Sequence, residues 1–387
     1  MDRLEDFLSG KPEVRQKGEL SEFQAFLPSF INREWYTEDP ETNKLMGDAM
    51  LALGNLSTLA EHLPDVDIYI KMHIRTEANC SSRIEGTRTT LEEDLLPIEE
   101  IAPEKRDDYR EVQNYVTAIN YGIDQIMAPK GLPLCNRLLR NCHFHLMQGV
   151  RGENKTPGEF RRTQNWIGGH SINSASYVPP SEERVPELMD DFERFINAES
   201  KIVPPLMKAA ILHYQFETIH PFLDGNGRIG RLMIPLFLLD QKILTKPCFY
   251  ISSYLESHRS EYYSALQNAR AENNLLGWYK FFLIAVMKTA NSVVRKFQNV
   301  TNYVGELNQY LIESNRRNTK NIRDVIWVFY SNPTLDISQL REKTQLTSQT
   351  LNSILADLVR DGILEELTGF SRNRVYQMAK YINLFMD

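Results

Sequence analysis

Apolar residues recur every three or four positions along most of this 387-residue chain, a spacing typical of amphipathic helices. Residues 151–186 differ, because they are rich in Gly, Asn, Ser and Pro, which indicates a long loop holding a β-hairpin. We therefore expect an all-α protein with one small hairpin. The predicted helices cover residues 43–59, 67–85, 107–127, 134–150, 186–198, 204–219, 228–242, 256–272 and 275–298.

The two ends of the chain have different patterns. Residues 1–105 predict an arm followed by helices, with the capping-box pattern Thr90–Glu93 opening a short helix, and a central helical domain follows over 106–300. The polar run that ends residues 301–314 suggests a linker. Residues 315–387 predict three helices and then a hairpin with a turn near Gly369, which is the order of a winged helix-turn-helix domain.

Composition narrows the class of protein. Hydrophobic residues make up 42% of the chain and charged residues 25%, which is the mix of a globular protein. The longest apolar run, Leu232–Leu239, is far shorter than the roughly 20 residues of a membrane span. The acidic N-terminus lacks the pattern of a signal peptide. We therefore expect a cytoplasmic protein without membrane contact. The cysteines have neither disulfide-framework nor zinc spacing: Cys80, Cys135, Cys142 and Cys248.

One twelve-residue segment, His220–Arg231, concentrates groups that carry chemistry. Its Gly-Asn-Gly turn at 225–227 can adopt positive φ and present consecutive N–H groups to an anion, and the helix that starts next adds its positive N-terminus. Arg228 and Arg231 share one face of that helix, which suits a polyphosphate. Asp224 is an oxygen ligand of the type Mg²⁺ prefers, and His220 is a candidate general base.

The segment matches the signature HPFx(D/E)GNGRxxR of the Fic family at every defined position, and we identify the resemblance on that basis. The similarity extends over about residues 60–300. The lead into the family's flap hairpin is similar to Gly158–Arg161 and Asn165–Gly169, and the exit of that hairpin is similar to Tyr177–Pro180. The helix that closes the family's adenine pocket is similar to Tyr254–Tyr263. The resemblance implies a Fic-type helical core with a small β-hairpin flap, joined to the C-terminal winged helix-turn-helix domain.

This resemblance implies transfer of AMP from ATP to a Ser, Thr or Tyr hydroxyl of a target protein, which includes the enzyme itself. His220 then corresponds to the general base, Asp224 to the Mg²⁺ ligand and Phe222 to a core anchor between them. Arg228 and Arg231 correspond to the residues that hold the β- and γ-phosphates. The remaining positions that the resemblance assigns to ATP are Ile167, Gly168, Gly225, Asn226, Gly227, Ile229, Gly230, Tyr262 and Tyr263.

A second motif lies upstream, in Ser81–Gly86, and resembles the inhibitory (S/T)xxxE(G/N) motif of self-restrained Fic proteins. Ser81 and Glu85 are four residues apart and share a helical face. The resemblance implies an ion pair between Glu85 and Arg231 that keeps the γ-phosphate from its place. The alternative is a plain helix end with a solvated Glu85.

Other functions stay open. Glu85 could instead orient a water that removes AMP from a modified protein, or the core could be a sensor in a DNA-binding regulator. Residues 315–387 hold ten basic and eight acidic residues, a balance of only +2, with Arg372 and Arg374 in the predicted wing. We therefore favour protein docking or dimer stabilisation over DNA binding, and the resemblance implies a homodimer.

Overall fold

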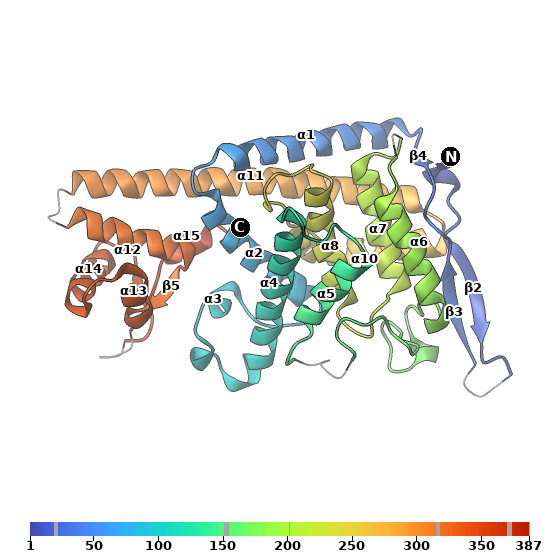
Figure 1. Cartoon of the computed structure of the whole chain (residues 1–387), viewed down its shortest axis with the longest axis horizontal. Coiled ribbons are helices and arrows are strands. Elements are labelled where there is room, and N and C mark those ends of the chain that lie inside the picture. Colours follow the sequence, from blue (N-terminus) through green and yellow to red (C-terminus); the bar gives the residue numbers. More distant parts are fainter. Residues whose placement is uncertain (19–21, 151–154, 201, 315–317, 370–373, 387) are drawn as a thin grey trace.

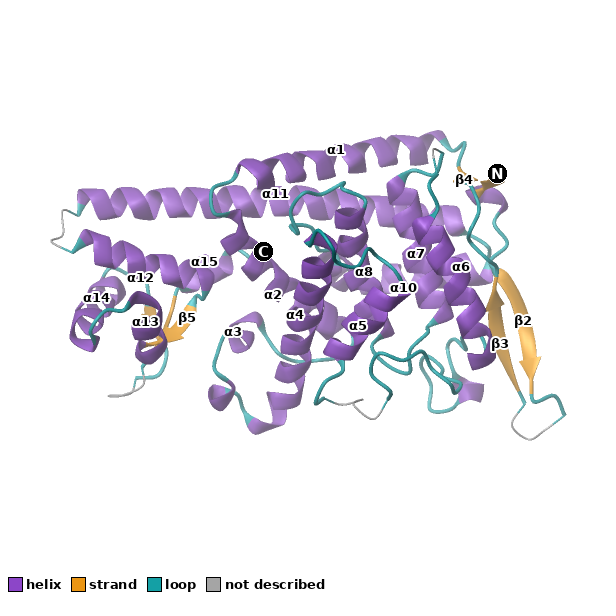
Figure 2. Cartoon of the chain, viewed as in Figure 1, coloured by secondary structure: helices purple, strands orange, loops and turns teal. Residues whose placement is uncertain are grey.

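A computed structural model describes residues 1–18, 22–150, 155–200, 202–314, 318–369 and 374–386. Helices dominate this part of the chain, and the strands form small sheets at its two ends (Figures 1 and 2). The helices are α1 (Pro40–His62), α2 (Val66–Ile84), α3 (Leu91–Asp94), α4 (Arg106–Met127), α5 (Asn136–Leu146), α6 (Val185–Asn197), α7 (Pro205–Ile219), α8 (Asn226–Asp240), α9 (Ser252–Ser257), α10 (Arg259–Ala271), α11 (Leu275–Glu313), α12 (Thr319–Ser331), α13 (Ile337–Thr344), α14 (Ser348–Arg360) and α15 (Ala379–Asn383).

The ends of several helices follow from local chemistry. At α1 the Asp39 carboxylate accepts a hydrogen bond from the Thr42 N–H at 2.8 Å, and Pro40 occupies the first turn, where no intrahelical N–H is needed. The helix therefore begins three residues before the predicted start. The predicted capping box is confirmed, because Thr90 and Glu93 exchange side-chain and backbone hydrogen bonds at the start of α3.

The N-terminal strands were not predicted. β2 (Gly10–Arg15) pairs with β3 (Phe23–Pro28) in an antiparallel hairpin, and β1 (Asp2–Arg3) pairs with β4 (Trp35–Tyr36) in parallel. Residues 1–105 are therefore not wholly helical. The hairpin lies in a segment with Pro12 and mixed polarity, so it has no clean alternation for sequence reasoning to detect. Over residues 155–186, the described part of the segment, the predicted hairpin is present only as an isolated bridge between Ile167 and Tyr177.

The predicted linker over residues 301–314 is wrong, because α11 continues as one helix through Glu313. Val304, Leu307 and Leu311 keep apolar side chains at helical spacing, and Leu307 and Leu311 are buried. Gly305 is tolerated in the helix, at a cost of about 1 kcal/mol relative to alanine. In Figure 1, α11 lies beside α1 along one long edge of the molecule and reaches the C-terminal elements.

The C-terminal elements follow the predicted order. Helices α12, α13 and α14 are followed by the β6–β7 hairpin, whereas β5, between α12 and α13, was not predicted and completes a three-stranded antiparallel sheet with the strand order β5-β7-β6. The strands are β5 (Thr334–Asp336), β6 (Glu365–Glu366) and β7 (Val375–Gln377). Arg372 of the predicted wing lies outside the described residues, as do residues 315–317 at the start of the predicted winged helix-turn-helix domain. Helix α12 packs against α2, so the C-terminal elements contact the central body through the helix that carries Ser81.

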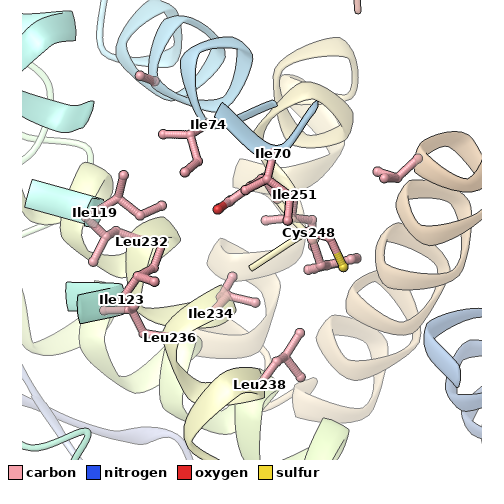
Figure 3. Close-up of a cluster of buried hydrophobic side chains, with 14 of the residues drawn as sticks. Ile70, Ile74, Ile119, Ile123, Leu232, Ile234, Leu236, Leu238, Cys248 and Ile251 are labelled. Carbon is pink, nitrogen blue, oxygen red and sulfur yellow. The ribbon is translucent and has the colours of Figure 1, made fainter. Parts of the chain in front are cut away.

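The buried apolar side chains form one cluster that extends from Leu4 to Phe385. Helix α8 lies at its centre and is buried on all sides, with contacts to α2, α4, α5 and α7. Figure 3 shows Leu232 and Leu236 of α8 facing Ile119 and Ile123 of α4. Among the described helices we find none that is both long and apolar enough to cross a bilayer.

Candidate active site

The loop that joins α7 to α8 carries His220 in a left-handed conformation, with φ 52° and ψ 60°. This conformation is uncommon for a residue with a side chain, so the surrounding contacts must hold it. The side chain of Asn226 provides one such contact, since it accepts a hydrogen bond from the Phe222 N–H and donates one to the Phe222 carbonyl, both at 2.8 Å. Asn226 is therefore a clamp for the loop.

Buried polar side chains from the segment before the flap hold the same loop from outside. The guanidinium of Arg161, which is 2% exposed, donates to the carbonyl oxygens of His220, Ile219 and Pro180. Asn165 donates to the Phe222 carbonyl at 2.9 Å. Arg161 thus satisfies carbonyls at the end of α7 and in the following loop, and Asn165 adds a second hydrogen bond to the Phe222 carbonyl beside that from Asn226.

His143 of α5 supports the loop through its ring and both ring nitrogens. Its ring stacks on Phe222 with centroids 3.8 Å apart. The Gly158 N–H donates to Nδ1 at 2.8 Å, so Nε2 carries the proton and donates to the Asp224 carbonyl at 3.0 Å. Phe222 is fully buried, which confirms its predicted role as a core anchor.

The imidazole of His220 is half-buried, and its Nδ1 atom is inaccessible to solvent. Burial, together with the nearby Arg161 guanidinium, lowers the pKa of His220 to about 4, although the Glu85 carboxylate opposes the shift. The pKa is thus lower than the ordinary value near 6.5 that the sequence suggested. The ring is neutral at pH 7, with Nε2 as the nitrogen available to a substrate.

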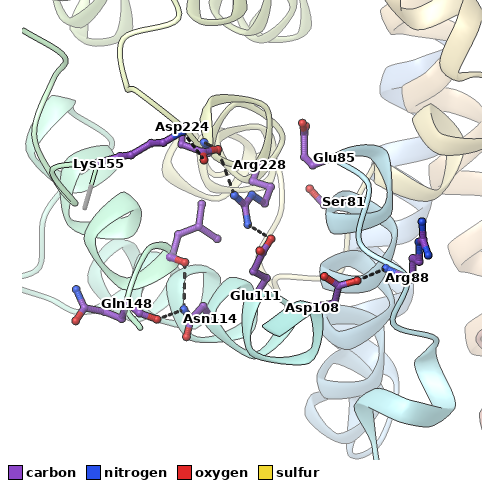
Figure 4. A network of polar contacts seen from close by, with 12 residues as sticks. Ser81, Glu85, Arg88, Asp108, Glu111, Asn114, Gln148, Lys155, Asp224 and Arg228 are labelled. Atoms are coloured by element: carbon purple, nitrogen blue, oxygen red, sulfur yellow. Dashed lines mark hydrogen bonds and ion pairs between the residues drawn. The ribbon is translucent and has the colours of Figure 1, made fainter. Parts of the chain in front are cut away.

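The N-terminus of α8 forms an anion site next to His220. Gly225 precedes the helix with φ +74°, and the first N–H groups of α8 have no partner within the helix. Arg228, 4% exposed, contributes its guanidinium here, and Nη1 lies 3.1 Å from the Glu111 carboxylate of α4. Figure 4 shows Glu111, Arg228 and Asp224 in one chain of contacts. Sequence reasoning missed Glu111, because it lies more than a hundred residues from the motif.

Asp224 lies at the outer edge of this anion site, with 39% of its side chain exposed. One carboxylate oxygen accepts the Gly225 N–H at 2.7 Å and lies 3.7 Å from Arg228 Nη2, while the other lies 3.6 Å from Lys155 Nζ. A single exposed carboxylate beside a phosphate site fits Mg²⁺, which usually takes one or two protein carboxylates and keeps waters and phosphate oxygens as further ligands.

Arg231 is buried beneath the anion site and is held by the end of α2. Its Nε donates to Ser81 Oγ and its Nη2 to the Ser81 carbonyl, both at 2.9 Å. Nη2 also lies 2.6 Å from Glu85 Oε1. Burial alone would raise the pKa of Glu85, but the Arg231 guanidinium outweighs this effect and lowers it. The predicted Glu85–Arg231 ion pair is therefore present, with 35% of the Glu85 side chain exposed.

The Glu85–Arg231 ion pair leaves no room for a side chain at position 227, which is a glycine. A Cβ atom at this position would lie 2.2 Å from Glu85 Oε1 and 2.9 Å from Arg231 Nη1. The Glu85 carboxylate therefore sits directly on the backbone of the Gly225–Gly227 turn. Gly86 follows with φ +104°, the left-handed conformation that ends α2.

Glu217 of α7 is a second carboxyl that sequence reasoning missed. Burial raises its pKa to about 7, although the positive charge of Arg231 opposes the shift. Its Oε1 atom has no hydrogen-bond partner among the described residues and contacts Gly230, where a Cβ would lie 2.2 Å away. Gly230 thus leaves room for the Glu217 carboxyl, and Ile229 is fully buried in the core. The predicted contact of these two residues with ATP stays a prediction.

The remaining predicted residues lie in the segment of the Ile167–Tyr177 bridge and on α10. Gly168 follows the bridge from Ile167 to Tyr177 with φ +69°, and a Cβ there would meet Ser176. Tyr263 is 41% exposed and lines a cavity together with Ile167. Tyr262 is 1% exposed and its hydroxyl lies 2.9 Å from His213 Nε2, so it supports this wall from the core instead of lining it.

A base at a helix end, an anion-binding helix N-terminus and two buried arginines define the class of site found in enzymes that act on phosphorylated substrates. Residues 133–238 match the Fic/DOC family, and residues 43–124 match the Fic/DOC family N-terminal region. The chain is therefore similar to the Fic/DOC family over these two segments.

Two curated relatives carry the name protein adenylyltransferase Fic. The one from Culex quinquefasciatus is 37% identical over 133 residues and the one from Drosophila melanogaster 36% identical over 133 residues. Each match covers 34% of this chain and 24% of the relative, so the chain spans about a quarter of the length of these relatives.

Solved structures share the fold. A Fic family protein from Desulfovibrio desulfuricans has a TM-score of 0.55 at 22% identity, over 89% of this chain and 97% of that one. A Fic domain containing signaling protein from Bacteroides thetaiotaomicron has a TM-score of 0.53 at 20% identity, over 65% of this chain and 97% of that one.

Proposed function

We propose that this protein is a protein adenylyltransferase, which transfers AMP from ATP to a hydroxyl side chain of a target protein. The observation that carries the proposal is the position of His220 beside the Gly225–Gly227 turn and Arg231. The names of the relatives over the same domain agree with this chemistry.

In the proposed reaction, His220 Nε2 takes the proton of the target hydroxyl. The hydroxyl oxygen forms a bond to the α-phosphorus of ATP, the bond from that phosphorus to the β-bridging oxygen breaks, and pyrophosphate leaves. A free pKa of about 4 makes His220 a weak base, but the negative charges of bound ATP raise that pKa toward the working pH. The α8 N-terminus and Arg228 stabilise the charge on the phosphates.

Asp224 would hold Mg²⁺ together with phosphate oxygens. Bound Mg²⁺ offsets the charge of the transferred and leaving phosphates and polarises them. The fit rests on the exposed carboxylate and on its position at the edge of the phosphate site.

We further propose that Glu85 inhibits the enzyme. Arg231 Nη2, which the γ-phosphate would need, is already paired with Glu85, and the Glu85 carboxylate occupies the surface of the Gly225–Gly227 turn. A phosphate of like charge cannot occupy the same space without displacing it. Ser81 holds Arg231 through two further hydrogen bonds, so the guanidinium stays in place when Glu85 leaves.

Incubation with ATP labelled at the α-phosphate tests the activity. Wild type and the His220→Ala variant are incubated with a cell extract and with themselves, and protein-bound label is measured. We expect label in protein with wild type and a loss of 10²–10⁴-fold with His220→Ala at unchanged melting temperature. Release of AMP from a modified protein, without incorporation, would favour the reverse reaction and contradict the proposal.

For residues 315–387 we propose a winged helix-turn-helix domain with a docking role. The order of α12, α13, α14 and the three-stranded sheet supports the fold. Arg360 of α14 pairs with Asp357, which leaves that helix a poor surface for DNA phosphates. We also propose a homodimer, which rests on the family resemblance. Light scattering tests the dimer, and a gel shift at moderate salt tests DNA binding.

A further inference from the structure

A lysine from outside the His220–Arg231 segment reaches the edge of the phosphate site. Lys155 Nζ lies 3.6 Å from Asp224 Oδ2. Figure 4 shows the Lys155 side chain extending toward Asp224, at the outer end of a chain of contacts that continues through Arg228 to Glu111. The charges along this chain alternate in sign, and Lys155 is its exposed, positive end.

The backbone beside Lys155 is fixed to the backbone of Asp224 through one buried histidine. His143 accepts the Gly158 N–H at Nδ1, at 2.8 Å, and donates from Nε2 to the Asp224 carbonyl at 3.0 Å. Arg140 Nε donates to the Gly158 carbonyl at 2.8 Å, so the turn that follows Lys155 is also tied to α5. The approach of Lys155 to Asp224 therefore depends on the packing of two backbone segments as well as on a long side chain.

The Lys155–Asp224 pair can separate at little cost. The two side chains are 53% and 39% exposed, and water screens ion pairs of this kind so that they contribute little to stability. Asp224 keeps other contacts when the ammonium leaves, because its Oδ1 accepts the Gly225 N–H at 2.7 Å and lies 3.7 Å from Arg228 Nη2. Lysine carries a compact charge on a flexible four-carbon stem, so the ammonium can move without the backbone.

Lys155 differs from the two arginines of the site in its partner. Arg228 pairs with Glu111 at 3.1 Å and Arg231 with Glu85 at 2.6 Å. The partner of Lys155 is Asp224, the carboxylate that would hold Mg²⁺. Because Mg²⁺ and an ammonium group repel each other, Lys155 loses this partner when the metal binds. The nearest new negative charge is then a phosphate at the N-terminus of α8, next to Asp224.

We propose that Lys155 is a further phosphate-binding residue of this site. Its ammonium neutralises Asp224 in the free protein and moves to phosphate oxygens of ATP when the nucleotide binds. The exchange alters only which anion the ammonium contacts, and no covalent bond forms or breaks. The inference rests on the proposed function, since it takes ATP as the ligand of the α8 N-terminus.

Calorimetric titration of the full chain with ATP and with adenosine tests the proposal, in EDTA and at saturating Mg²⁺. Lys155→Met removes the charge and keeps an unbranched stem, whereas Lys155→Arg keeps the charge. Lys44→Met, at an exposed lysine of α1, is the matched control. Each variant is also made with Glu85→Gly, so that Glu85 does not compete with ATP for Arg231.

We expect Lys155→Met to bind ATP at least tenfold more weakly than its parent in EDTA, and to bind adenosine equally well, because only ATP carries phosphates. Lys155→Arg should retain most of the affinity for ATP, and Lys44→Met all of it. The loss in Lys155→Met should be smaller at saturating Mg²⁺, since the metal then supplies positive charge beside the same carboxylate.

Equal binding of ATP by Lys155→Met and its parent in EDTA would overturn the assignment. Equal losses for ATP and adenosine would also overturn it, since they would mean that Lys155 only supports the local fold. A protein that binds ATP in this Lys155-dependent way but transfers no AMP would support the role of Lys155 and contradict the adenylyltransferase proposal. Absence of ATP binding in wild type and Glu85→Gly alike would overturn both.

Discussion

Arg231 is held by two different kinds of contact, and this difference defines its chemistry. Ser81 fixes the guanidinium through neutral hydrogen bonds to Nε and Nη2, which remain whatever the charge at the site. Glu85 supplies the only ionic contact within 4 Å that the described residues provide to it. Removal of Glu85 therefore leaves the positive charge of Arg231 unpaired while Ser81 keeps the guanidinium in its position. A reversible inhibitor needs this property.

Asp224 gives a prediction at the same scale. Asp224→Asn keeps the shape of the side chain and its hydrogen bond to the Gly225 N–H, but removes the charge that Mg²⁺ requires. We expect at least a tenfold loss of AMP transfer at 1 mM Mg²⁺, measured with α-labelled ATP and partly recovered at higher Mg²⁺. Full wild-type transfer in excess EDTA would show that the metal has no role.

The local part of this site was predictable from sequence, and the distant part was not. Residues 220–231 lie within twelve positions, so their types and spacing define the turn, the helix start and the arginine face. Glu111 and Arg161 come from distant segments, and only the folding of the chain brings them to the motif. Glu217 lies three residues before His220, but its contact with Gly230 depends on the packing of α7 against α8. No periodicity marks a buried Glu as the partner of a particular Arg.

At the scale of elements, a glycine sets how closely α4 and α8 approach. A Cβ at Gly122 would lie 2.7 Å from Leu236 Cδ1 and 3.2 Å from Cys142 Sγ. Figure 3 places Ile119 and Ile123, on either side of Gly122, against the same face of α8. The crossing positions the α8 N-terminus and Glu111 relative to each other, so the glycine contributes to the geometry of the active site.

Two alanine substitutions test this packing as a matched pair. Gly122→Ala overfills the contact, and we expect a loss of about 1–3 kcal/mol in the free energy of unfolding. Gly54→Ala lies in the interior of α1 with open space around the new Cβ, so it should stabilise the protein by up to about 1 kcal/mol. Thermal unfolding measures both. A stabilising Gly122→Ala would contradict the close α4–α8 crossing.

Helices were easier to predict than strands for a physical reason. A long amphipathic helix repeats its pattern several times, whereas β2 and β3 have six residues each and depend on pairing with each other. β3 also pairs beyond the hairpin, since the Phe26 N–H donates to the Val178 carbonyl at 2.9 Å. Phe26 and Val178 are some 150 positions apart, so the sequence around either residue gives no indication of this contact.

At the scale of the whole molecule, α2 links the C-terminal elements to the active site. Its first half contacts α12 and α11, with Tyr69 6.4 Å from Phe297 between ring centroids, and its last turn holds Ser81 and Glu85. Figure 1 shows the C-terminal elements at one end of α11 and the β2–β3 hairpin at the other. Helix α2 thus connects the C-terminal elements with Ser81 and Glu85.

The buried histidines predict how stability depends on pH. Burial lowers the pKa values of His73 and His213 to about 3 and those of His143 and His220 to about 4. Unfolded histidines titrate near 6.5, so between pH 6.5 and 4 the unfolded chain binds more protons than the folded one. Stability is therefore complete above pH 6.5 and falls as pH drops, by up to about 1.4 kcal/mol per histidine per pH unit.

Melting temperatures at pH 7.5 and 5.5 check this expectation. The raised pKa of Glu217, about 7, acts in the opposite direction, because a folded carboxyl that holds its proton gains stability as pH falls. Burial also raises the pKa values of Glu77 and Asp94, which act in the same direction as Glu217. The four histidines outweigh these three carboxyls, so we expect a lower melting temperature at pH 5.5. An equal or higher value at pH 5.5 would mean that the histidines are not buried as described.

The central claim is that the Glu85 carboxylate restrains an adenylyltransferase by occupying Arg231. The most direct test is a time course of AMP incorporation from α-labelled ATP for wild type, Glu85→Gly, and Glu85→Gly with Arg231→Ala. We predict at least about tenfold faster transfer, including self-modification, for Glu85→Gly, equivalent to ~1.4 kcal/mol, and loss of most of that gain in the double variant. A Glu85→Gly protein no faster than wild type would contradict the account.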